Sequence, residues 1–576
     1  MSTNSLTGSK YIWNLPSVEK SNLIDLAVSY NISIPIIQVL LERGIGTKKE
    51  IDNYLFSSFE KDVARPELLK DAEISVKRII TAIKNGEKIL IAGDYDVDGI
   101  TSSAMMMICL LPLDAKINFF LPHRVNDGYG LSVKTVEKAA KNGYTVIVTV
   151  DNGITAFDAA AKAKELGVDL IITDHHRPRE GALPAAYAIV DPHQSDCPYP
   201  YKYFAGVGVI FKLMALLYEY MDLKLPEKVY ELLLLGTVAD VVPLTGENRF
   251  WVRHGLSIVN QKESLPLKIL KDNVQFKKSS LSSTDIGFFI TPQINALGRL
   301  EDARRGVRFL IGSDQEEVYS VGSVLKDFNQ ARKDVEKKVY SDVIKFIDPD
   351  GQGIGDQRIL IAYSSEWPPG IIGLVASKIV GAYNRPTLLF HITKDGLAKG
   401  SCRSTPDFSI FNALQANKEL LISFGGHAVA AGLALDQANL SILKERLEEY
   451  IRSAMPFVAD KPILKLDAEI SLTEVNKKLT TDMQYLEPFG NSNTQPVFYL
   501  RNATLVDGPT VLKEVHIKCT VFSDGVLKPM IFFNRPDLYQ SLLNKKDEPI
   551  DFAVCVVTNE WNGKVSVELQ GMDVAL

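Results

Sequence analysis

The chain has 576 residues, a net charge of −6, an apolar fraction of 46% and a charged fraction of 23%. These values are typical of a globular protein of about three to five domains. The five cysteines are scattered and form no C-x-x-C pair, which argues against a disulfide framework or a thiolate zinc site and favours a reducing cytoplasm. No uninterrupted apolar run approaches the roughly 20 residues that span a bilayer, so we expect no membrane partner.

The first 65 residues predict a small helical region, and strands and helices then alternate up to about residue 200. Strands that alternate with helices are typical of βαβ units, whose right-handed crossovers place helices on both faces of a parallel sheet. We therefore expect a parallel-sheet α/β domain at residues 66–280. Its predicted strands are Lys88–Ala92, Ile117–Leu121, Thr145–Val150, Val168–Ile172 and a shorter strand near Tyr187–Val190.

Three further regions are predicted after this domain. Residues 281–350 form a linker with one long helix, Asp314–Ile347, which would span about 50 Å and in which Gly322 is a weak point. Residues 351–457 form a second α/β domain. Residues 458–576 contain short strands and turns, which predict a small β-barrel such as an OB-fold.

Residues with the chemistry of metal ligands follow three of the predicted strands. They are Asp94, Asp96 and Asp98 after the first strand, Asp151 after the third, and Asp174, His175 and His176 after the fourth. Ligands bind at the carboxyl ends of the strands in an open parallel sheet. Carboxylate oxygen and imidazole nitrogen suit Mn²⁺ and related divalent ions. The sequence therefore predicts a metal site at this edge of the sheet.

The run from Asp94 to Gly99 has two other interpretations. A calcium-binding loop needs Glu at its twelfth position, which is Met105 here, so that interpretation fails. The acids could instead cap the following helix, but one carboxylate would satisfy that role. Three carboxylates so close together repel one another unless cations neutralise them. We therefore favour metal ligation.

Asp240 is a single acid in the apolar run Gly236–Leu244. It could be a helix-end residue that reaches water, but a buried carboxylate rarely lacks a partner, so we favour ligation. Asp174 could hold an imidazole in the correct tautomer without being a ligand itself.

Whole-chain charge argues mildly against a nucleic-acid partner, although an acidic metal site contributes to that charge. The local balance differs between Arg249 and Lys278, where seven Lys or Arg residues accompany two acids. This stretch could line a phosphate track or form a solvated helical face, and the sequence favours neither.

The acidic and histidine blocks, in this order, resemble the DHH phosphoesterase superfamily. Further motifs narrow the resemblance to the bacterial RecJ family of single-strand-specific DNA exonucleases, over nearly the whole chain beyond about residue 65. These motifs are Pro122-His123-Arg124, Gly206-Val207-Gly208-Val209, Asn295–Leu300, Ser401–Ser404 and Gly425–Gly432. The resemblance implies a DHH domain, a long connecting helix, a DHHA1 domain and a C-terminal OB-fold.

The resemblance also implies a pair of Mn²⁺ or Mg²⁺ ions. The positions that match its metal ligands are Asp96, Asp98, Asp151, His175 and Asp240. Small relatives carry a His upstream of the first D-x-D, and here Ile91-Ala92-Gly93 contains none. Asp94 is the natural substitute, and we include it among the expected ligands.

Other matching positions are expected to contact the nucleic acid. The resemblance gives His176 and His427 a role at the scissile phosphate. Ser401 and Arg403 match a pocket that holds the nucleotide and its terminal phosphate, and Arg124 and Arg299 are expected to add to it, because guanidinium binds phosphate bidentately. Barrel aromatics that could stack on the strand are Phe489, Tyr499, Phe522, Phe532 and Phe533.

The resemblance implies a 5′-to-3′ exonuclease on single-stranded DNA that acts in recombination and repair. One alternative is a DHH phosphoesterase on short oligonucleotides or cyclic dinucleotides, which the long helix and barrel disfavour. Another is a replication scaffold that has lost its ligands, which the retained Asp and His positions disfavour. The family implies single-strand-binding protein and a RecQ-type helicase as partners, and we expect a cytoplasmic monomer.

Overall fold

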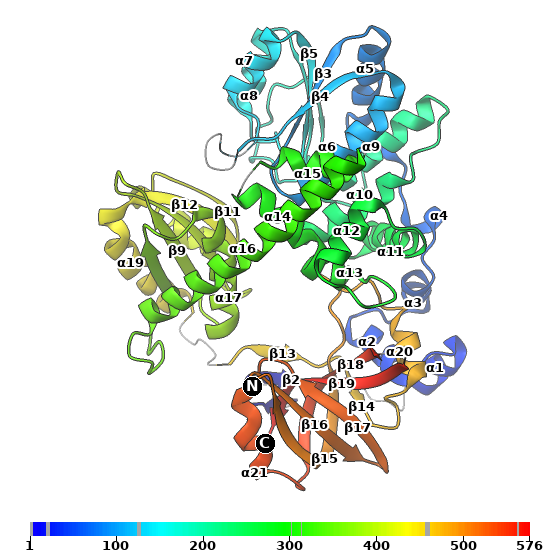
Figure 1. Cartoon of the computed structure of the whole chain (residues 1–576), viewed down its shortest axis with the longest axis vertical. Coiled ribbons are helices and arrows are strands. Elements are labelled where there is room, and N and C mark those ends of the chain that lie inside the picture. The colour runs from blue at the N-terminus through cyan, green and yellow to red at the C-terminus, as the bar shows by residue number, and fades with distance from the viewer. Residues whose placement is uncertain are drawn as a thin grey trace. The chain divides into compact units, whose positions relative to one another are not determined.

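The computed structural model describes residues 4–18, 23–123, 128, 130–300, 302–312, 314–455, 461–561 and 564–576 (Figure 1). The chain divides into two compact units. The first unit combines residues 1–326 with residues 463–576, and the second comprises residues 327–462. Each unit is described by itself below.

A five-stranded parallel sheet forms the centre of the first half of unit 1. Its strands are β3 (Lys88–Gly93), β4 (Lys116–Phe120), β5 (Tyr144–Val150), β6 (Asp169–Thr173) and β7 (Ala188–Val190). The spatial order is β4-β3-β5-β6-β7, with every pair parallel. The strand order therefore reverses between β3 and β5, and a ligand site is expected at the carboxyl ends of these two strands.

Helices cover both faces of this sheet, as the βαβ pattern predicts. The helices α7 (Val133–Lys141) and α8 (Phe157–Glu165) share one buried core with the sheet. The helices α5 (Ala72–Lys84), α6 (Val97–Leu110) and α9 (Gly206–Tyr220) contact the strands from the other side. Figure 1 shows α7 and α8 on one side of the sheet and α5 on the other. Helix α6 is buried almost all round because α9, α10 (Lys228–Ala239) and α15 (Arg304–Ile311) also pack on it.

A helical region follows the sheet. Its helices are α10 (Lys228–Ala239), α11 (Gly246–Gln261), α12 (Leu265–Asn273), α13 (Ser283–Asp285), the π-helical turn η4 (Ile286–Ile290), α14 (Thr291–Leu300), α15 (Arg304–Ile311) and α16 (Gln315–Ile347). The predicted long helix corresponds to α16, which passes through the boundary between the two units. Close packing explains the glycine at position 322 of this helix, because a Cβ there would lie 2.4 Å from Cγ2 of Ile269 on α12.

The C-terminal part of unit 1 is a closed five-stranded barrel. Its strands are β15 (Phe498–Leu512), β16 (His516–Ser523), β17 (Val526–Phe532), β18 (Ile550–Trp561) and β19 (Lys564–Ala575). Their order is β15-β16-β17-β19-β18, and pairing of β15 with β18 closes the barrel. Helix α21 (Tyr539–Asn544) lies between β17 and β18, and β14 (Ala468–Ile470) adds to β15. This closed arrangement confirms the predicted OB-fold.

The N-terminal segment packs on the barrel side of unit 1. Its elements are β1 (Ser5–Thr7), β2 (Ile12–Asn14), α1 (Ile24–Tyr30), α2 (Ile34–Glu42), α3 (Lys48–Leu55) and α4 (Phe59–Asp62). Strand β2 pairs in parallel with β13 (Ile463–Lys465), and α2 shares a core with barrel residues. The buried Asp573 accepts hydrogen bonds from Nε1 of Trp13 and from the backbone N–H groups of Lys10 and Tyr11. The two ends of unit 1 are therefore tied together.

Unit 2 contains a mixed five-stranded sheet in the order β11-β12-β10-β9-β8. The strands are β8 (Leu360–Ser364), β9 (Thr387–Ile392), β10 (Leu397–Arg403), β11 (Ser423–His427) and β12 (Ala430–Asp436). The helices are α17 (Pro369–Tyr383), α18 (Ile410–Gln415) and α19 (Leu440–Ala454). A parallel-sheet domain, a long helix, a second α/β domain and a C-terminal barrel were all predicted, and this fold class is confirmed.

Within the described residues, no single helix is long and apolar enough to cross a membrane. The bent pair α1 and α2 passes such a test by length and composition only.

A fully buried ion pair lies between α9 and α11. Lys212 pairs with Glu247, and both side chains are 2% exposed. Lys212 Nζ also donates to the carbonyl oxygen of Ala64 at 2.9 Å, while Glu247 accepts from Tyr199 Oη at 2.7 Å and Trp251 Nε1 at 3.0 Å. Burial lowers the pKa of Lys212, and Glu247 opposes that shift. Such a network is stable only while every member keeps its partner.

We expect Lys212→Met to destabilise unit 1 by about 3–5 kcal/mol, because Glu247 would remain charged and buried without its cation. Urea unfolding followed by tryptophan fluorescence measures the loss. Lys77→Met is the control, since Lys77 forms an exposed pair with Glu73 whose loss costs less than about 1 kcal/mol. Equal unfolding midpoints for the two variants would contradict this account.

Candidate metal centre

The loop after β3 places three carboxylates at the start of α6. Asp96 caps this helix, because its Oδ1 accepts the backbone N–H groups of Asp98 at 2.9 Å and Gly99 at 3.1 Å. Asp98 is buried, and its carboxylate accepts the backbone N–H groups of Gly206 at 2.5 Å and Val207 at 2.8 Å. One acid therefore does cap α6, as the alternative interpretation required, whereas Asp98 accepts N–H groups from the segment at Gly206 and Val207.

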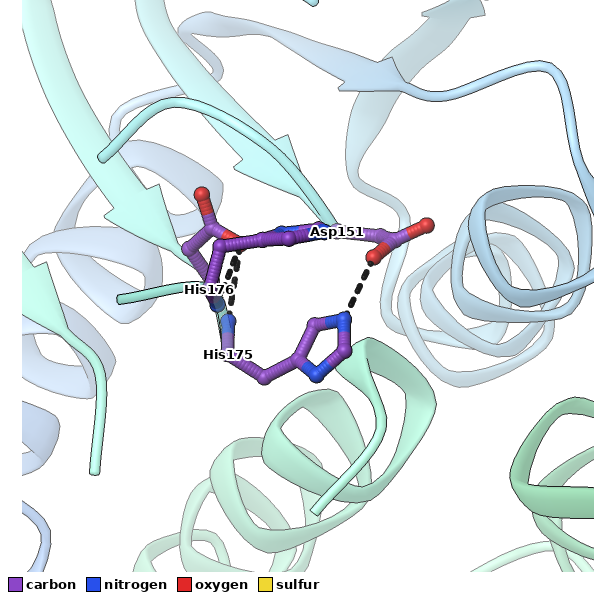
Figure 2. A group of neighbouring side chains, drawn as sticks. Asp151, His175 and His176 are labelled. Atoms are coloured by element: carbon purple, nitrogen blue, oxygen red, sulfur yellow. Dashed lines mark hydrogen bonds and ion pairs between the residues drawn. The ribbon is translucent and has the colours of Figure 1, made fainter. Parts of the chain in front are cut away.

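Asp151 follows β5 in a left-handed backbone conformation, with φ of 62°. Asp and Asn tolerate this conformation better than other non-glycine residues do. The side chain is buried, and its Oδ1 lies 3.1 Å from Nε2 of His175, which follows β6. Figure 2 shows the His175 ring directed at the Asp151 carboxylate. The turn thus aims Asp151 across the carboxyl ends of two neighbouring strands.

His175 is the point where the separate blocks meet. Its Nε2 lies 3.1 Å from Asp151 Oδ1, 3.6 Å from Asp240 Oδ2 and 3.8 Å from Asp98 Oδ2. Asp240 reaches this cluster from the C-terminal end of α10. The structure therefore brings together side chains that follow β3, β5, β6 and α10 and whose positions together span about 140 residues of sequence.

The cluster contains three overlapping groups that could each hold a cation. In each group, the potential ligand atoms lie within 4.8 Å of one another. The groups are Asp94 with Asp96 and Asp151, Asp98 with His175 and Asp240, and Asp151 with Asp174, His175 and His176. Asp151 occurs in two groups and His175 in two, so both lie at the centre of the cluster.

Asp174 organises the two histidines from behind. Its Oδ1 accepts the backbone N–H groups of His175 and His176 and lies 2.7 Å from Nδ1 of His176. Its Oδ2 accepts the backbone N–H of Ile154 at 2.9 Å. Burial raises the pKa of Asp174, but the hydrogen bond from His176, the charge of His176 and the hydrogen bond from Ile154 outweigh it and lower the pKa to about 2. Asp174 thus orients the imidazoles, as its position after the strand suggested.

The cluster is electrostatically strained without a cation. Burial and the charge of Asp240 raise the pKa of Asp98 to about 7. Burial and the charge of Asp96 raise the pKa of Asp240 to about 8, and burial and Asp98 raise that of Asp151 well above its ordinary value. Burial lowers the pKa of His175, so its imidazole is neutral and can act as a metal ligand. A divalent cation would relieve the repulsion among these carboxylates.

His176 has the opposite behaviour. Burial lowers its pKa, but the hydrogen bond to Asp174 and the surrounding carboxylates outweigh burial and raise the pKa to about 9. The cationic imidazolium form is therefore favoured beside the acidic cluster. A group of this kind suits contact with a phosphate oxygen.

Three glycines allow the elements around the cluster to approach closely. A Cβ on Gly99 would lie 2.5 Å from the carbonyl oxygen of Asp94, and one on Gly206 would lie 2.6 Å from Cβ of Asp151. A Cβ on Gly298 of α14 would lie 2.2 Å from the carbonyl oxygen of Tyr95. Gly206 and Gly298, one from each of the Gly206–Val209 and Asn295–Leu300 motifs, are thus required by packing against the acidic loops.

The sequence interpretation missed Asp191, which follows β7 as the other acids follow β3, β5 and β6. The same position after a strand could have identified it. Asp191 is fully buried, and burial raises its pKa to about 8. Its Oδ1 accepts the backbone N–H of His193 at 2.7 Å, whereas its Oδ2 has no hydrogen-bond partner among the described residues. Asp191 and His193 lie behind the Asp174–His176 loop, whose Asp174 N–H donates to the carbonyl oxygen of Val190.

The predicted nucleotide-binding residues of unit 2 lie at one end of its sheet. Ser401 and Arg403 are two residues apart on β10, and Arg403 Nη1 donates to Ser401 Oγ at 3.2 Å. Arg403 pairs with Ala430 on β12, and Ala430 pairs on its other side with His427 on β11. Arg403 and His427 therefore occupy one row across three strands, about 10 Å apart along that row. Gly373 of α17 faces Ser401 and Arg403.

The two arginines that were expected to add to the nucleotide pocket are Arg124 and Arg299, and the structure describes the side chain of neither. Arg124 lies outside the residues that the structure describes. Arg299 is in the last turn of α14, directly after Gly298.

The stretch from Arg249 to Lys278 is mostly committed to other contacts. Arg249 is buried and donates to the carbonyl oxygens of Tyr54 and Tyr485, so it joins α11 to other parts of unit 1. Lys271 pairs with Glu263 and Lys278 with Asp285. These contacts therefore argue against a continuous phosphate-binding track along this stretch.

Only some of the barrel aromatics are available to a ligand. Tyr499 and Phe532 are buried, and Tyr499 Oη donates to Asp551. Phe522 on β16 and Phe533 after β17 are exposed, and Phe522 pairs across the strands with the exposed Leu527. These residues leave an apolar face on the β16–β17 side of the barrel, where OB-folds bind oligonucleotides.

Comparison with known proteins identifies three family domains in the chain. The DHH family, N-terminal domain, matches residues 88–237, the DHHA1 domain matches residues 356–453, and the RecJ OB domain matches residues 466–573. The acidic cluster is formed largely by the first of these domains. The Ser401, Arg403 and His427 row lies in the second.

Full-length relatives and solved structures are also similar. The single-stranded-DNA-specific exonuclease RecJ of Bacillus subtilis is 32% identical over 574 residues, which covers 99% of this chain and 72% of the relative. The crystal structure of RecJ from Thermus thermophilus in complex with Mn²⁺ aligns with a TM-score of 0.82 at 26% identity, covering 98% of this chain and 79% of that chain. The structure of the same protein with Mg²⁺ aligns with a TM-score of 0.76 at 25% identity, covering 98% and 78%.

Proposed function

Because this chain belongs to the RecJ family of single-stranded-DNA-specific exonucleases, we propose that the cluster around His175 is its hydrolytic centre. The protein is a metal-dependent exonuclease that acts on single-stranded DNA, a function consistent with recombination and repair. The observation that carries the proposed site is the meeting of Asp98, Asp151 and Asp240 at one imidazole nitrogen.

The residues present fit Mn²⁺ or Mg²⁺. The ligand atoms are carboxylate oxygens and one neutral imidazole, which both ions accept. The raised carboxyl pKa values of Asp98 and Asp240 also support a bound cation, since it would stabilise the anionic forms that burial disfavours. We propose that two ions are held by Asp94, Asp96, Asp98, Asp151, His175 and Asp240. Bound there, such ions would lower the pKa of water and neutralise charge on the phosphate that is hydrolysed.

The side chains of the protein have distinct tasks in this proposal. Asp151 and His175 hold the centre of the cluster. Asp174 fixes the orientation of His176 and keeps a proton on it, so that His176 presents positive charge to a phosphate oxygen. Preorganised charge of this kind stabilises a phosphoryl transition state without a protein nucleophile.

We propose further that Ser401, Arg403 and His427 bind the nucleotide and its phosphates, with Arg124 and Arg299 as additional contacts. Support comes from the row that Arg403 and His427 share on the unit 2 sheet. The exposed face with Phe522 and Leu527 is proposed to bind the strand through stacking and apolar contact. The residues of the DHH region, linker, DHHA1 region and OB region are proposed as 66–280, 281–350, 351–457 and 458–576, preceded by residues 1–65.

Single-strand-binding protein and a RecQ-type helicase are proposed as partners on the strength of the family alone, and the protein is proposed to be a monomer. A cytoplasmic location is proposed because all five cysteines are buried free thiols. The alternative of a phosphoesterase on short oligonucleotides or cyclic dinucleotides is not favoured, since the barrel and relatives of full length point to a longer strand.

Digestion of single strands labelled at the 5′ or the 3′ end tests the proposed polarity and metal requirement. We expect early release of a labelled mononucleotide only from the 5′-labelled strand, and only with Mn²⁺ or Mg²⁺ present. Chelation of the metal should abolish the reaction, and added Mn²⁺ should restore it. Equal release from both ends, or undiminished release in chelator, would contradict the proposal.

A further inference from the structure

A π-helical turn carries a pair of adjacent, exposed aromatic side chains on the stretch that leads to the acidic loop. The turn η4 joins α13 to α14. Turns of this kind are rare in proteins, and those that occur are often found at functional sites. Its Ile286 and Ile290 are fully buried, whereas Phe288 is 75% exposed and Phe289 is 47% exposed. Two adjacent phenylalanines in water lose the benefit of burial, so their exposure calls for an explanation.

The turn packs on the helix that delivers Asp240. A Cβ on Gly287 would lie 3.4 Å from Cγ1 of Val238, two residues before Asp240 in α10. Val241, directly after Asp240, is itself 64% exposed with φ of 58°. Gly287, directly before the aromatic pair, therefore contacts α10 two residues before the aspartate that enters the acidic cluster.

The helix that begins at this turn also reaches the acidic loop. Gly298 of α14 packs against the carbonyl oxygen of Tyr95, between Asp94 and Asp96. Ten residues separate Phe288 from Gly298, which corresponds to about 15 Å of helix. The aromatic pair thus lies one short span of helix away from the site of hydrolysis.

The opposite end of the same region contacts the segment that leads into the barrel. Ser283 Oγ donates to the carbonyl oxygen of Phe489 at 2.7 Å, and Asn491 Nδ2 donates to the carbonyl oxygen of Val241 at 2.7 Å. Lys278, 60% exposed at its side chain, pairs with Asp285 immediately before the turn. The aromatic rings therefore lie on a helical stretch, from Ser283 to Leu300, that begins beside the segment leading into the barrel and ends at the acidic loop, whereas Lys278 lies in the loop before this stretch.

We propose that Phe288 and Phe289 form a stacking platform for nucleobases of the single strand, a short distance from the bond that is hydrolysed. Every nucleobase has a π face, so such a platform binds any sequence, as an exonuclease requires. It also favours a strand whose bases are unstacked and unpaired, which adds to selection against duplex DNA. The platform rests on the proposed function, because its ligand is the substrate of the cluster around His175.

The test combines protein variants with strands that lack one base. We expect Phe288→Ala/Phe289→Ala to weaken binding of single-stranded DNA by about 5- to 150-fold for each base that stacks on the two rings. A single abasic position, moved one nucleotide at a time along the strand, should weaken binding to the wild type at one or two positions only. The double variant should show no such position. Equal sensitivity of wild type and double variant at every position would overturn the platform.

Two further measurements separate the platform from folding and from the hydrolytic site. Phe288→Trp should retain binding, and its added tryptophan fluorescence should be quenched by single-stranded DNA in chelator, where no cleavage occurs. The rise in melting temperature that Mn²⁺ produces, which reports ion binding at the cluster around His175, should be the same in the double variant as in the wild type. If the wild type cleaved no DNA, the proposed function would fail, whereas cleavage by the wild type with unaltered binding by the double variant would sink the platform alone.

Tyr187→Ala is the matched control. Tyr187 is also an exposed aromatic residue of unit 1, but it precedes β7 and so lies at the amino-terminal edge of the sheet, away from the cluster. We expect its removal to leave both strand binding and the abasic profile unchanged. A loss equal to that of the double variant would show that any exposed ring contributes, and would contradict the assignment.

Discussion

Asp151→Asn is expected to lower the rate of single-strand hydrolysis by at least about 10³-fold while the protein remains folded. The substitution keeps the size of the side chain, and Asn tolerates the left-handed backbone at φ of 62° as Asp does. It removes the carboxylate that belongs to two of the three possible cation groups. Loss of a single charge-stabilising contact costs about 10²–10³ in rate, and loss of a carboxylate shared by two groups should cost more.

In the absence of metal, the same substitution should leave the stability of the folded protein unchanged or increase it. Burial and the charges of the neighbouring carboxylates of Asp98, Asp96, Asp240 and Asp94 all raise the pKa of Asp151, which means that its charge is unfavourable in the folded protein. We therefore expect the melting temperature of the Asp151→Asn protein in chelator to equal or exceed that of the wild type. The increase in melting temperature that Mn²⁺ gives to the wild type should largely disappear.

Asp114→Asn is the control for this pair of measurements. Asp114 is an exposed aspartate that also has a left-handed backbone, with φ of 56°, but it lies before β4 and outside the cluster. Its replacement should leave both the rate and the Mn²⁺-dependent stabilisation unchanged. Wild-type activity in Asp151→Asn, or a full thermal response to Mn²⁺, would remove the basis for the assigned site.

Gly206→Ala should reduce hydrolysis by about 10²-fold and weaken Mn²⁺ binding, although Gly206 has no side chain to contribute. The added Cβ would lie 2.6 Å from Cβ and 2.9 Å from Cα of Asp151, so helix α9 or the Asp151 turn must move. The first two backbone N–H groups of that helix bind Asp98, and a shift would release them. Displacement of a reacting geometry by about 1 Å costs roughly 10²-fold in rate.

A Mn²⁺ titration of activity and of melting temperature measures this effect. We expect the half-saturating Mn²⁺ concentration to rise about 10- to 100-fold, the range for loss of contacts that orient metal ligands. Gly381→Ala on α17 is the control, because no heavy atom of the described residues lies within 4 Å of a Cβ built there. That variant should be unchanged or slightly more stable, since Ala favours helix over Gly. Identical titrations for Gly206→Ala and wild type would show that the contact is not limiting.

Much of this site could be anticipated from local sequence. The strands before Asp94, Asp151 and Asp174 are continuous apolar runs, as fully buried parallel strands require. The carboxyl ends of parallel strands meet at one edge, so the proximity of the acids followed from the strand assignments alone. Asp240 was the exception, because only its unusual apolar surroundings marked it and its approach to His175 depends on how α10 packs.

The features that local sequence did not reveal have separate physical reasons. Asp191 was overlooked because β7 has only three residues and gives a weak strand pattern. The neutralisation of Lys271 and Lys278 depends on the fold, since their acidic partners are eight and seven residues away. Whether Tyr499 or Phe522 faces water depends on the register of the barrel strands, because adjacent residues point to opposite faces.

The attachment of the first strands to the last one has a consequence for biosynthesis. Trp13 and the backbone of Lys10 and Tyr11 are held by Asp573, and Ser33 and Arg43 bond to Asp482 and Asp467. The ribosome synthesises the amino-terminal segment first, yet the residues to which this segment binds are translated more than 400 residues later. The apolar helices of this segment therefore remain exposed to water while the parallel sheet is completed on the nascent chain. During that interval it is the part of the newborn polypeptide that most needs a chaperone.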